Sequence, residues 1–306
     1  MLAVLLALAS AIGFGASDYT AGLATRATSV LRVTLSSQGA SLAMSLLIVP
    51  WLSPLRLTAG GFWWGTIAGL AGTCGAIVLY LGFRHAAFSV ASTLSAVGSA
   101  ALSVLAGLLL GERPGALALT GIALALPAIA AVSASPGEPA STAPAVDGGV
   151  AVGGTTPGET EAGSPGGRPL AGVGFGILAG VCFALYFVGL NRAGTASGLW
   201  PVVVGEVISV PLVAAIAAAS GQLGLPPAGA RWQAAATGVC GGAATMLFFV
   251  ASHDGLLAVT AVIVALYPAG TIVLARVLLG ERLSRMRVAG LCLAAASVAL
   301  IAAAGQ

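Results

Sequence analysis

The sequence predicts an all-α integral membrane protein with ten transmembrane helices, arranged as two inverted five-helix repeats. Three observations support this fold class. Hydrophobic residues make up 58% of the 306 positions and charged residues only 7%, whereas soluble domains carry about a quarter charged residues. The few charges are spaced so that long uncharged stretches lie between them. A proline-rich segment also divides the chain into two parts that share motifs.

The uncharged stretches supply ten candidate spans, each close to the ~20 apolar residues that a helix needs to cross ~30 Å of hydrocarbon. Their apolar runs are continuous rather than alternating, which favours helices over a β-barrel. The first span has no basic residue before Asp18, so we expect a retained helix rather than a signal peptide. The spans are predicted at 2–20, 31–51, 61–82, 88–110, 115–134, 170–190, 199–219, 232–251, 256–278 and 287–304.

The segment 135–169 has a different composition from the rest of the chain. It contains six of the fifteen prolines, four acidic residues and one arginine, and no apolar side chain larger than valine. Such a segment cannot bury enough apolar surface to offset the entropy lost on ordering. It is therefore predicted to be a disordered linker between a first five-helix unit, 1–134, and a second unit, 170–306.

The two units resemble each other in sequence. When Glu112 is aligned with Glu281, an offset of 169 residues aligns Trp63 with Trp232 without gaps. Because five spans is an odd number, the second unit must enter the membrane in the opposite orientation. Inverted repeats of this kind are common in transporters, where the substrate site lies near the midplane between the repeats. The same offset also aligns Gly69 with Gly238, Gly72 with Gly241, Tyr80 with Phe249, Val90 with Val259 and Gly121 with Gly290.

Each unit carries a Gly-Glu-Arg turn before its last helix, and the motif GFGASDYTAGLATR, at 13–26, begins within the first span. With these motifs and two five-helix units, the chain resembles the EamA family of the drug/metabolite transporter superfamily. The resemblance covers the whole chain except the linker, although Ile12 stands where the family often has tryptophan. It implies a transporter and leaves the transported molecule open. No cofactor is expected.

We therefore expect a secondary-active transporter in the cell membrane, acting as an exporter of a small metabolite, with proton coupling as one option. Flipping of a lipid-linked substrate remains an alternative. A membrane-embedded enzyme is disfavoured, because no cluster of catalytic residue types occurs. The expected partners are a small-molecule substrate and the lipid bilayer, with a homodimer left open. The net charge of +3 is too small and scattered for nucleic-acid binding.

Glu206 is the main candidate functional residue. It lies within a predicted span, with uncharged residues at 193–205 and 207–230, where an ionised side chain costs roughly 2.5–3.5 kcal/mol. A carboxyl group there could exchange a proton during transport or pair with a cationic substrate. The alternative is a structural role, in which Glu206 points inward and pairs with Arg276, the lone charge in the ninth span, or with a polar neighbour.

Asp18 lies near the end of the first span and Arg32 near the start of the second. An ion pair between them is the main interpretation, and a role for Asp18 in coupling is the alternative. Tyr267 precedes Pro268, which either breaks the ninth helix beside a cavity or only kinks it. Further polar or aromatic residues that could line a central cavity are Gln38, Tyr80, Tyr186 and Asn191.

The two Gly-Glu-Arg turns are predicted to be structural. They fall where one helix ends and the next begins, so their side chains can cap backbone groups and form local pairs at the water boundary. The residues of these turns are Gly111, Glu112 and Arg113 in the first unit, and Gly280, Glu281 and Arg282 in the second.

Overall fold

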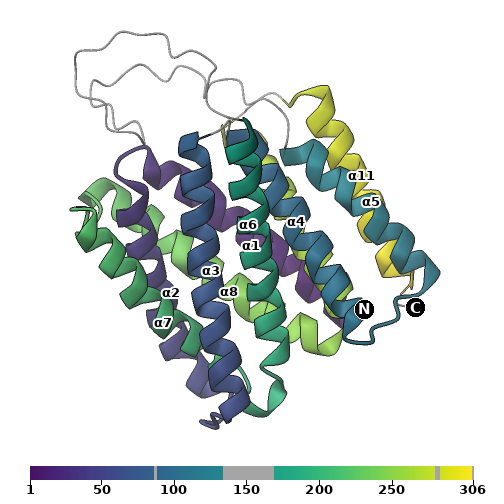
Figure 1. The fold of residues 1–306 in the computed structure, drawn as a ribbon, viewed down its shortest axis with the longest axis horizontal. Coiled ribbons are helices and arrows are strands. Elements are labelled where there is room, and N and C mark those ends of the chain that lie inside the picture. Colours follow the sequence, from purple (N-terminus) through teal and green to yellow (C-terminus); the bar gives the residue numbers. More distant parts are fainter. Residues whose placement is uncertain (86–87, 134–168, 280–282, 305–306) are drawn as a thin grey trace.

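The computed structural model describes residues 1–85, 88–133, 169–279 and 283–304, and all regular structure within these ranges is helical (Figure 1). The predicted linker lies outside the described residues, except for Pro169, at which α6 begins. The helices are α1 (Leu2–Thr25), α2 (Val30–Leu52), α3 (Ala59–His85), α4 (Phe88–Leu109), α5 (Ala116–Ser133), α6 (Pro169–Arg192), the 3₁₀ helix η1 (Thr195–Ser197), α7 (Trp200–Ala219), α8 (Ala228–Asp254), α9 (Leu257–Ala265), α10 (Tyr267–Leu279) and α11 (Arg285–Ala304).

The all-helical membrane fold predicted from the sequence is confirmed. In the part of the chain that the structure describes, nine helical segments are long and apolar enough to cross a membrane. The stretch predicted at 88–110 corresponds to α4, in which Thr93–Leu109 is apolar. The ninth predicted span, 256–278, is divided between α9 and α10.

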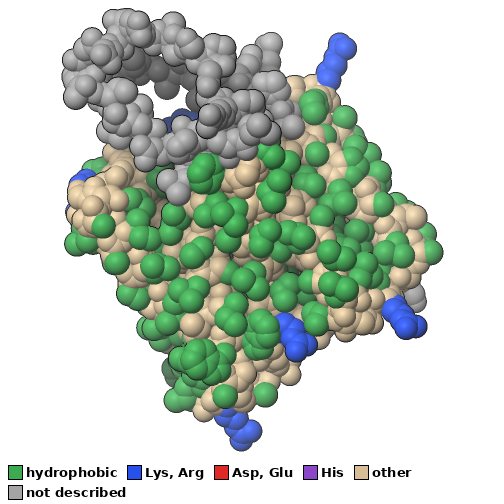
Figure 2. All heavy atoms as spheres, in the orientation of Figure 1, with side chains coloured by type: hydrophobic (Ala, Val, Ile, Leu, Met, Phe, Trp, Pro, Cys, Tyr) green, Lys and Arg blue, Asp and Glu red, His purple; other side chains and the backbone are tan. Residues whose placement is uncertain are grey.

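The outer surface of the bundle is apolar. Figure 2 shows hydrophobic side chains over most of the visible face, with the Arg side chains toward its ends. Large side chains such as Leu47, Leu109 and Val277 are more than two-thirds exposed. In water this much exposed apolar surface would be unfavourable, whereas in a bilayer it faces hydrocarbon. The protein is therefore a multi-pass membrane protein whose lipid-facing surface is formed by these helices.

Helices from the two parts of the chain pack mainly against each other. In the first part α1 packs on α8 and α10, α2 on α7 and α8, and α3 on α6 and α7. The helix α4 packs on α6 and α9, while α5 and α11 form a pair at one edge of the bundle (Figure 1). The two termini lie at the same end (Figure 1).

Close approach between these helices depends on glycine. A Cβ atom on Gly69 of α3 would overlap the carbonyl oxygen of Gly205 in α7, and one on Gly238 of α8 would overlap that of Ser37 in α2. In each case the obstacle is backbone, which cannot rotate away as a side chain would. Without a hydrophobic driving force between helices in lipid, such close contacts are a main source of stability.

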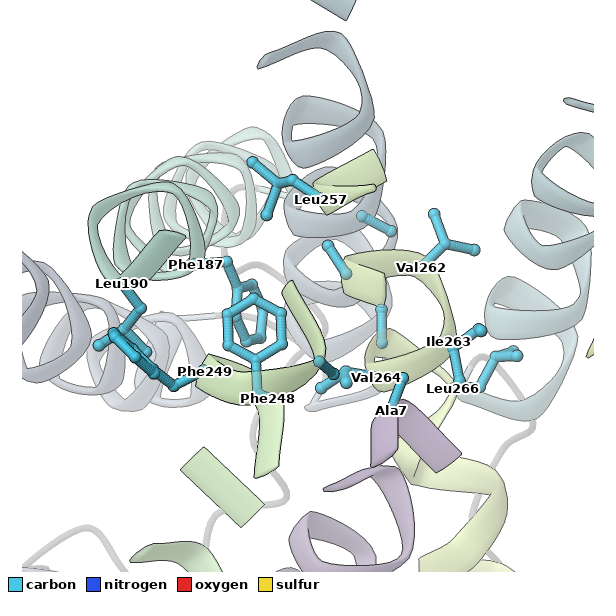
Figure 3. Close-up of a cluster of buried hydrophobic side chains, with 14 of the residues drawn as sticks. Ala7, Phe187, Leu190, Phe248, Phe249, Leu257, Val262, Ile263, Val264 and Leu266 are labelled. Atoms are coloured by element: carbon cyan, nitrogen blue, oxygen red, sulfur yellow. The ribbon is translucent and has the colours of Figure 1, made fainter. Parts of the chain in front are cut away.

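The largest apolar core surrounds α9. All residues of this helix except Val259 are buried, and its residues from Val262 to Val264 have no exposed surface. Figure 3 shows them together with Phe187 and Leu190 of α6 and Phe248 of α8. A helix that is apolar and buried on all sides belongs to the centre of a bundle. The helix α9 therefore fills the space between α4, α1 and α6 at the end of the bundle where the termini lie.

Glu112 caps this central helix. Its Oε1 accepts a hydrogen bond from the backbone N–H of Leu257 at 2.5 Å, and its Oε2 accepts one from Ala258 at 2.9 Å. These N–H groups belong to the first turn of α9, which has no partner for them within the helix and carries partial positive charge. The first Gly-Glu-Arg turn thus joins the two parts of the chain. The second turn, at 280–282, lies outside the described residues.

Replacing Glu112 by alanine should lower the free energy of unfolding by about 1.5–3 kcal/mol, because two buried backbone donors lose a charged acceptor. Thermal unfolding of the detergent-purified protein measures this change. Arg113→Ala is the matched control, since Arg113 is the next residue in the same turn and is exposed. Equal effects in the two variants would contradict a capping role for Glu112.

Candidate functional site

A central cavity of about 320 Å³ lies between the two parts of the chain. Its walls come from helices α1 to α4 and from α6 to α10, whereas α5 and α11 contribute none of its described lining residues. Pockets for small molecules typically enclose about 300–1,000 Å³. The cavity is therefore large enough for a small metabolite, and helices of both parts enclose it.

The cavity lining is rich in hydroxyl groups but carries little charge. Asp18 and Glu206 are the charged side chains among the described lining residues, and arginine and histidine are absent from that set. The uncharged polar lining residues are Ser17, Ser37, Gln38, Ser41, Thr73, Ser95, Ser99, Tyr186, Ser209, Thr237, Thr245 and Tyr267.

Glu206 lies in α7 and is only 8% exposed. Its Oε1 accepts a hydrogen bond from the hydroxyl of Ser41 in α2, while its Oε2 has no hydrogen-bond partner among the described residues. Ser41 is a polar neighbour of the kind expected as a structural partner of Glu206, whereas the other expected partner, Arg276, is exposed on α10 and does not line the cavity. A buried hydrogen-bond acceptor without a partner costs free energy unless a bound group donates to it.

The position of Glu206 follows from the packing of its own helix. The preceding residue, Gly205, allows α3 to approach at Gly69. One turn further on, the Ser209 hydroxyl donates both to the carbonyl of Gly205, at 2.8 Å, and to that of Gly69, at 3.1 Å. This contact holds α7 against α3, so the carboxyl group of Glu206 has a defined place in the cavity wall.

Asp18 also lines the cavity. Its side chain is exposed, and since it belongs to the lining, that exposure is toward the cavity. The predicted ion pair with Arg32 is not formed, and the Arg32 Nε atom is buried without a hydrogen-bond partner in the described part of the chain. The prediction failed because α1 turns Asp18 toward the centre of the bundle rather than toward the start of α2.

The ninth span breaks next to the cavity. The helix α9 ends at Ala265, Leu266 has φ −78° and ψ 3°, and α10 begins at Tyr267. Tyr267 lines the cavity, and the rings of Tyr267 and Phe14 lie 6.3 Å apart. Pro268 lacks the N–H group that would continue the hydrogen-bond ladder, which accounts for the break. The sequence had left open whether the proline breaks or only kinks the helix.

The other predicted lining residues have different positions. Gln38 and Tyr186 line the cavity, and the Tyr186 hydroxyl shares a hydrogen bond with Thr245 at 2.8 Å. Asn191 is not among the lining residues and donates to the carbonyl of Ser252 at 2.8 Å, which links α6 to α8. Tyr80 lies in α3, but its side chain is outside the described part of the structure.

Sequence reasoning missed Ser41, the hydrogen-bond partner of Glu206, and the lining residues Thr73 and Phe183. Serine and threonine are common in transmembrane helices, where they often bond to the carbonyl three or four residues earlier, so their presence alone does not indicate a site. No periodicity marks the inward face of these helices, because both faces are apolar. The aligned repeat could have drawn attention to Ser37, which corresponds to Glu206.

Comparison with known proteins agrees with this fold. Residues 170–303 match the model of the EamA-like transporter family. A search of curated proteins found no match. Among solved structures, 25 chains match. One of them, titled "Crystal structure of protein", has a TM-score of 0.70 and 18% sequence identity, with 96% of this chain and 98% of that chain covered. At this identity the likeness shows the fold alone. The second part of the chain, residues 170–303, is thus similar to the EamA-like transporter family of the drug/metabolite transporter superfamily.

Proposed function

We propose that this protein is a secondary-active carrier that exports a small metabolite across the cell membrane by alternating access. In this proposal ten transmembrane helices form two inverted repeats, 1–134 and 170–306, joined by the linker 135–169. The observation that carries the proposal is the pseudo-twofold packing of the two parts around a central cavity with a buried carboxyl group.

The helix contacts follow a twofold rule. If α1 to α3 are exchanged with α6 to α8, α4 with the pair α9 and α10, and α5 with α11, the most extensive helix contacts are reproduced. The contact of α1 with α8 becomes that of α6 with α3, and the contact of α2 with α8 becomes that of α7 with α3. The pairs α2 with α7, α4 with α9, and α5 with α11 exchange with themselves. An inverted repeat requires this pattern.

Individual residues follow the same rule, with the offset of 169 taken from the sequence. A Cβ atom on Gly13 would lie 3.0 Å from the Cβ of Ala244. The offset carries this pair to Cys182 and Gly75, and a Cβ on Gly75 would lie 3.1 Å from the Cβ of Cys182. Three further contacts each have a counterpart at the same offset. The contact of Ser17 with Gly241 corresponds to that of Tyr186 with Gly72, and the contact of Thr20 with Thr237 corresponds to that of Gly189 with Ala68. The contact of Gly121 with Ile301 corresponds to that of Gly290 with Val132.

Twofold packing supports a carrier because it gives two equivalent ways to close the bundle. Here α9 and its Glu112 cap fill the end where the termini lie. The equivalent elements of the other repeat can close the opposite end in a second state of similar energy. Alternation between the two states exposes the central cavity to one side of the membrane at a time.

Glu206 provides a way to couple this exchange to protons. A carboxyl group in the cavity wall, with Oε1 bonded to Ser41 and Oε2 without a hydrogen-bond partner among the described residues, can release its proton on one side and take one up on the other. Exchange of substrate for protons would move the substrate outward, because the proton gradient across a cell membrane normally points inward. This is the basis for the proposed export direction.

Counterflow in vesicles tests the carrier function. Vesicles containing the purified protein are loaded with an unlabelled compound, chosen in turn from amino acids, nucleosides and cationic dyes, and uptake of the labelled compound is measured. A carrier gives transient accumulation of label that depends on the internal compound and is absent from protein-free vesicles. Steady single-channel currents without counterflow would instead identify a channel, and chemical conversion of the compound would identify an enzyme.

A further inference from the structure

We infer that the cavity binds a small organic cation, an amine with an apolar or aromatic body. This inference rests on the proposed carrier function and adds the chemical class of its substrate. The cavity contains two carboxyl groups, Asp18 and Glu206, and no basic side chain among its described lining residues. An anion would meet two acidic groups without a compensating charge, whereas an ammonium group would meet its complement.

The two acids are not explained by the fold. The offset of 169 aligns Asp18 with Phe187 and Glu206 with Ser37, and all four residues line the cavity. Each repeat therefore builds the same helix with an uncharged residue at the corresponding position. The helix packing follows twofold symmetry, but the two acidic residues have no acidic counterparts in the other repeat. Because the same packing forms without a carboxyl group at the equivalent positions, the carboxyl groups are not required to form the bundle. Their cost in a membrane points to a ligand that uses them.

Two polar groups of the cavity lining, those of Glu206 and Thr73, are incompletely bonded. Glu206 is 8% exposed, and its Oε2 has no hydrogen-bond partner in the described structure. Thr73, on the facing helix α3, is 3% exposed and its hydroxyl also has no partner there. An ammonium group has three donors and no acceptor, so it can supply the donor that the carboxylate oxygen lacks. Buried polar atoms left without partners at a cavity wall are expected where a ligand completes the site.

The remaining wall suits the body of such a molecule. Aromatic rings from both parts of the chain line the cavity, and two pairs of them are in contact. The rings of Phe14 and Tyr267 lie 6.3 Å apart, and those of Tyr186 and Phe187 lie 5.3 Å apart. Aromatic faces attract cations and also pack against apolar groups. A neutral metabolite would use these rings but would leave both carboxyl groups without a charged partner.

Matched ligands test the charge of the substrate directly. Full-length protein in lipid nanodiscs is titrated with sets of three compounds that share one body and differ in a terminal amine, alcohol or carboxylate. Suitable sets are 2-phenylethylamine with 2-phenylethanol and 3-phenylpropionate, and the corresponding isopentyl and hexyl compounds. Binding is measured by calorimetry and by the increase in unfolding temperature. We expect the amine of at least one set to bind at least about tenfold more tightly than its two counterparts, a difference of about 1.4 kcal/mol.

The variants Asp18→Asn and Glu206→Gln should each weaken amine binding at least about tenfold while preserving the unfolding temperature of the empty protein. Asp254→Asn is the control, because Asp254 is an exposed carboxylate at the end of α8 and does not line the cavity. Equal binding of alcohols or carboxylates, or the absence of amine binding in all three sets, would overturn the inference. Counterflow of a neutral or anionic compound would overturn it too, yet would leave the carrier function standing.

Discussion

Glu206→Gln is expected to reduce substrate-dependent proton movement by about 100-fold in sealed vesicles. The glutamine side chain has nearly the same size, and its amide oxygen can still accept the hydrogen bond from Ser41. It cannot release or accept a proton and it carries no charge. A charge-assisted contact contributes up to about 3 kcal/mol, which corresponds to a change of this size. A pH-sensitive dye inside the vesicles reports the proton flux after each compound of the counterflow panel is added.

Two comparisons make this result specific. Asp254→Asn changes an exposed carboxylate outside the cavity in the same way, and it should leave the flux unchanged. The unfolding temperature of Glu206→Gln should stay close to that of the unmodified protein, since the bond to Ser41 is kept. If substrate moves normally in the variant and protons still accompany it, Glu206 has a structural role and another group carries the proton.

Gly69→Ala and Gly238→Ala are expected to destabilise the bundle by about 1–3 kcal/mol each, the usual cost of overpacking a close-packed core. The methyl group added at Gly69 would overlap the carbonyl oxygen of Gly205, and the one added at Gly238 would overlap the carbonyl oxygen of Ser37. Because the obstacle is backbone in both cases, relief requires two helices to move apart. The unfolding temperature in detergent, together with the yield of folded protein, measures the effect.

Gly174→Ala is the matched control for these two substitutions. Gly174 lies in α6, and a Cβ atom there would meet nothing within 4 Å. Alanine is favoured over glycine within a helix by up to about 1 kcal/mol, so this variant should be as stable as the unmodified protein or slightly more stable. If all three variants behave alike, the close contacts between α3 and α7 and between α8 and α2 do not limit stability. Similar losses at Gly69 and Gly238 are what a twofold arrangement requires.

The sequence by itself determined the positions of the helices. The stretch predicted at 199–219 corresponds to Trp200–Ala219, and the one predicted at 31–51 corresponds to Val30–Leu52. This agreement has a simple physical cause. Charged groups are expelled from hydrocarbon and backbone amides must be bonded within it, so the spacing of the charges dictates where helices begin and end. The offset of 169 residues between similar positions in the two parts of the chain was also readable, because rare residues such as Trp63 and Trp232 mark it.

Only the tertiary structure decided which side chains meet. The bond from Ser41 to Glu206, the bonds from Glu112 to the first turn of α9, and the position of Asp18 at the cavity join residues far apart in the chain or depend on how a helix is rotated. In a soluble helix, an apolar stripe would reveal that rotation. In a membrane helix the lipid face and the packed face are both apolar, so the pattern carries no such signal. The expected pairs of Asp18 with Arg32 and of Glu206 with Arg276 are absent from the described part of the structure for this reason. Proximity in sequence and rarity of charge say nothing about the direction in which a side chain points.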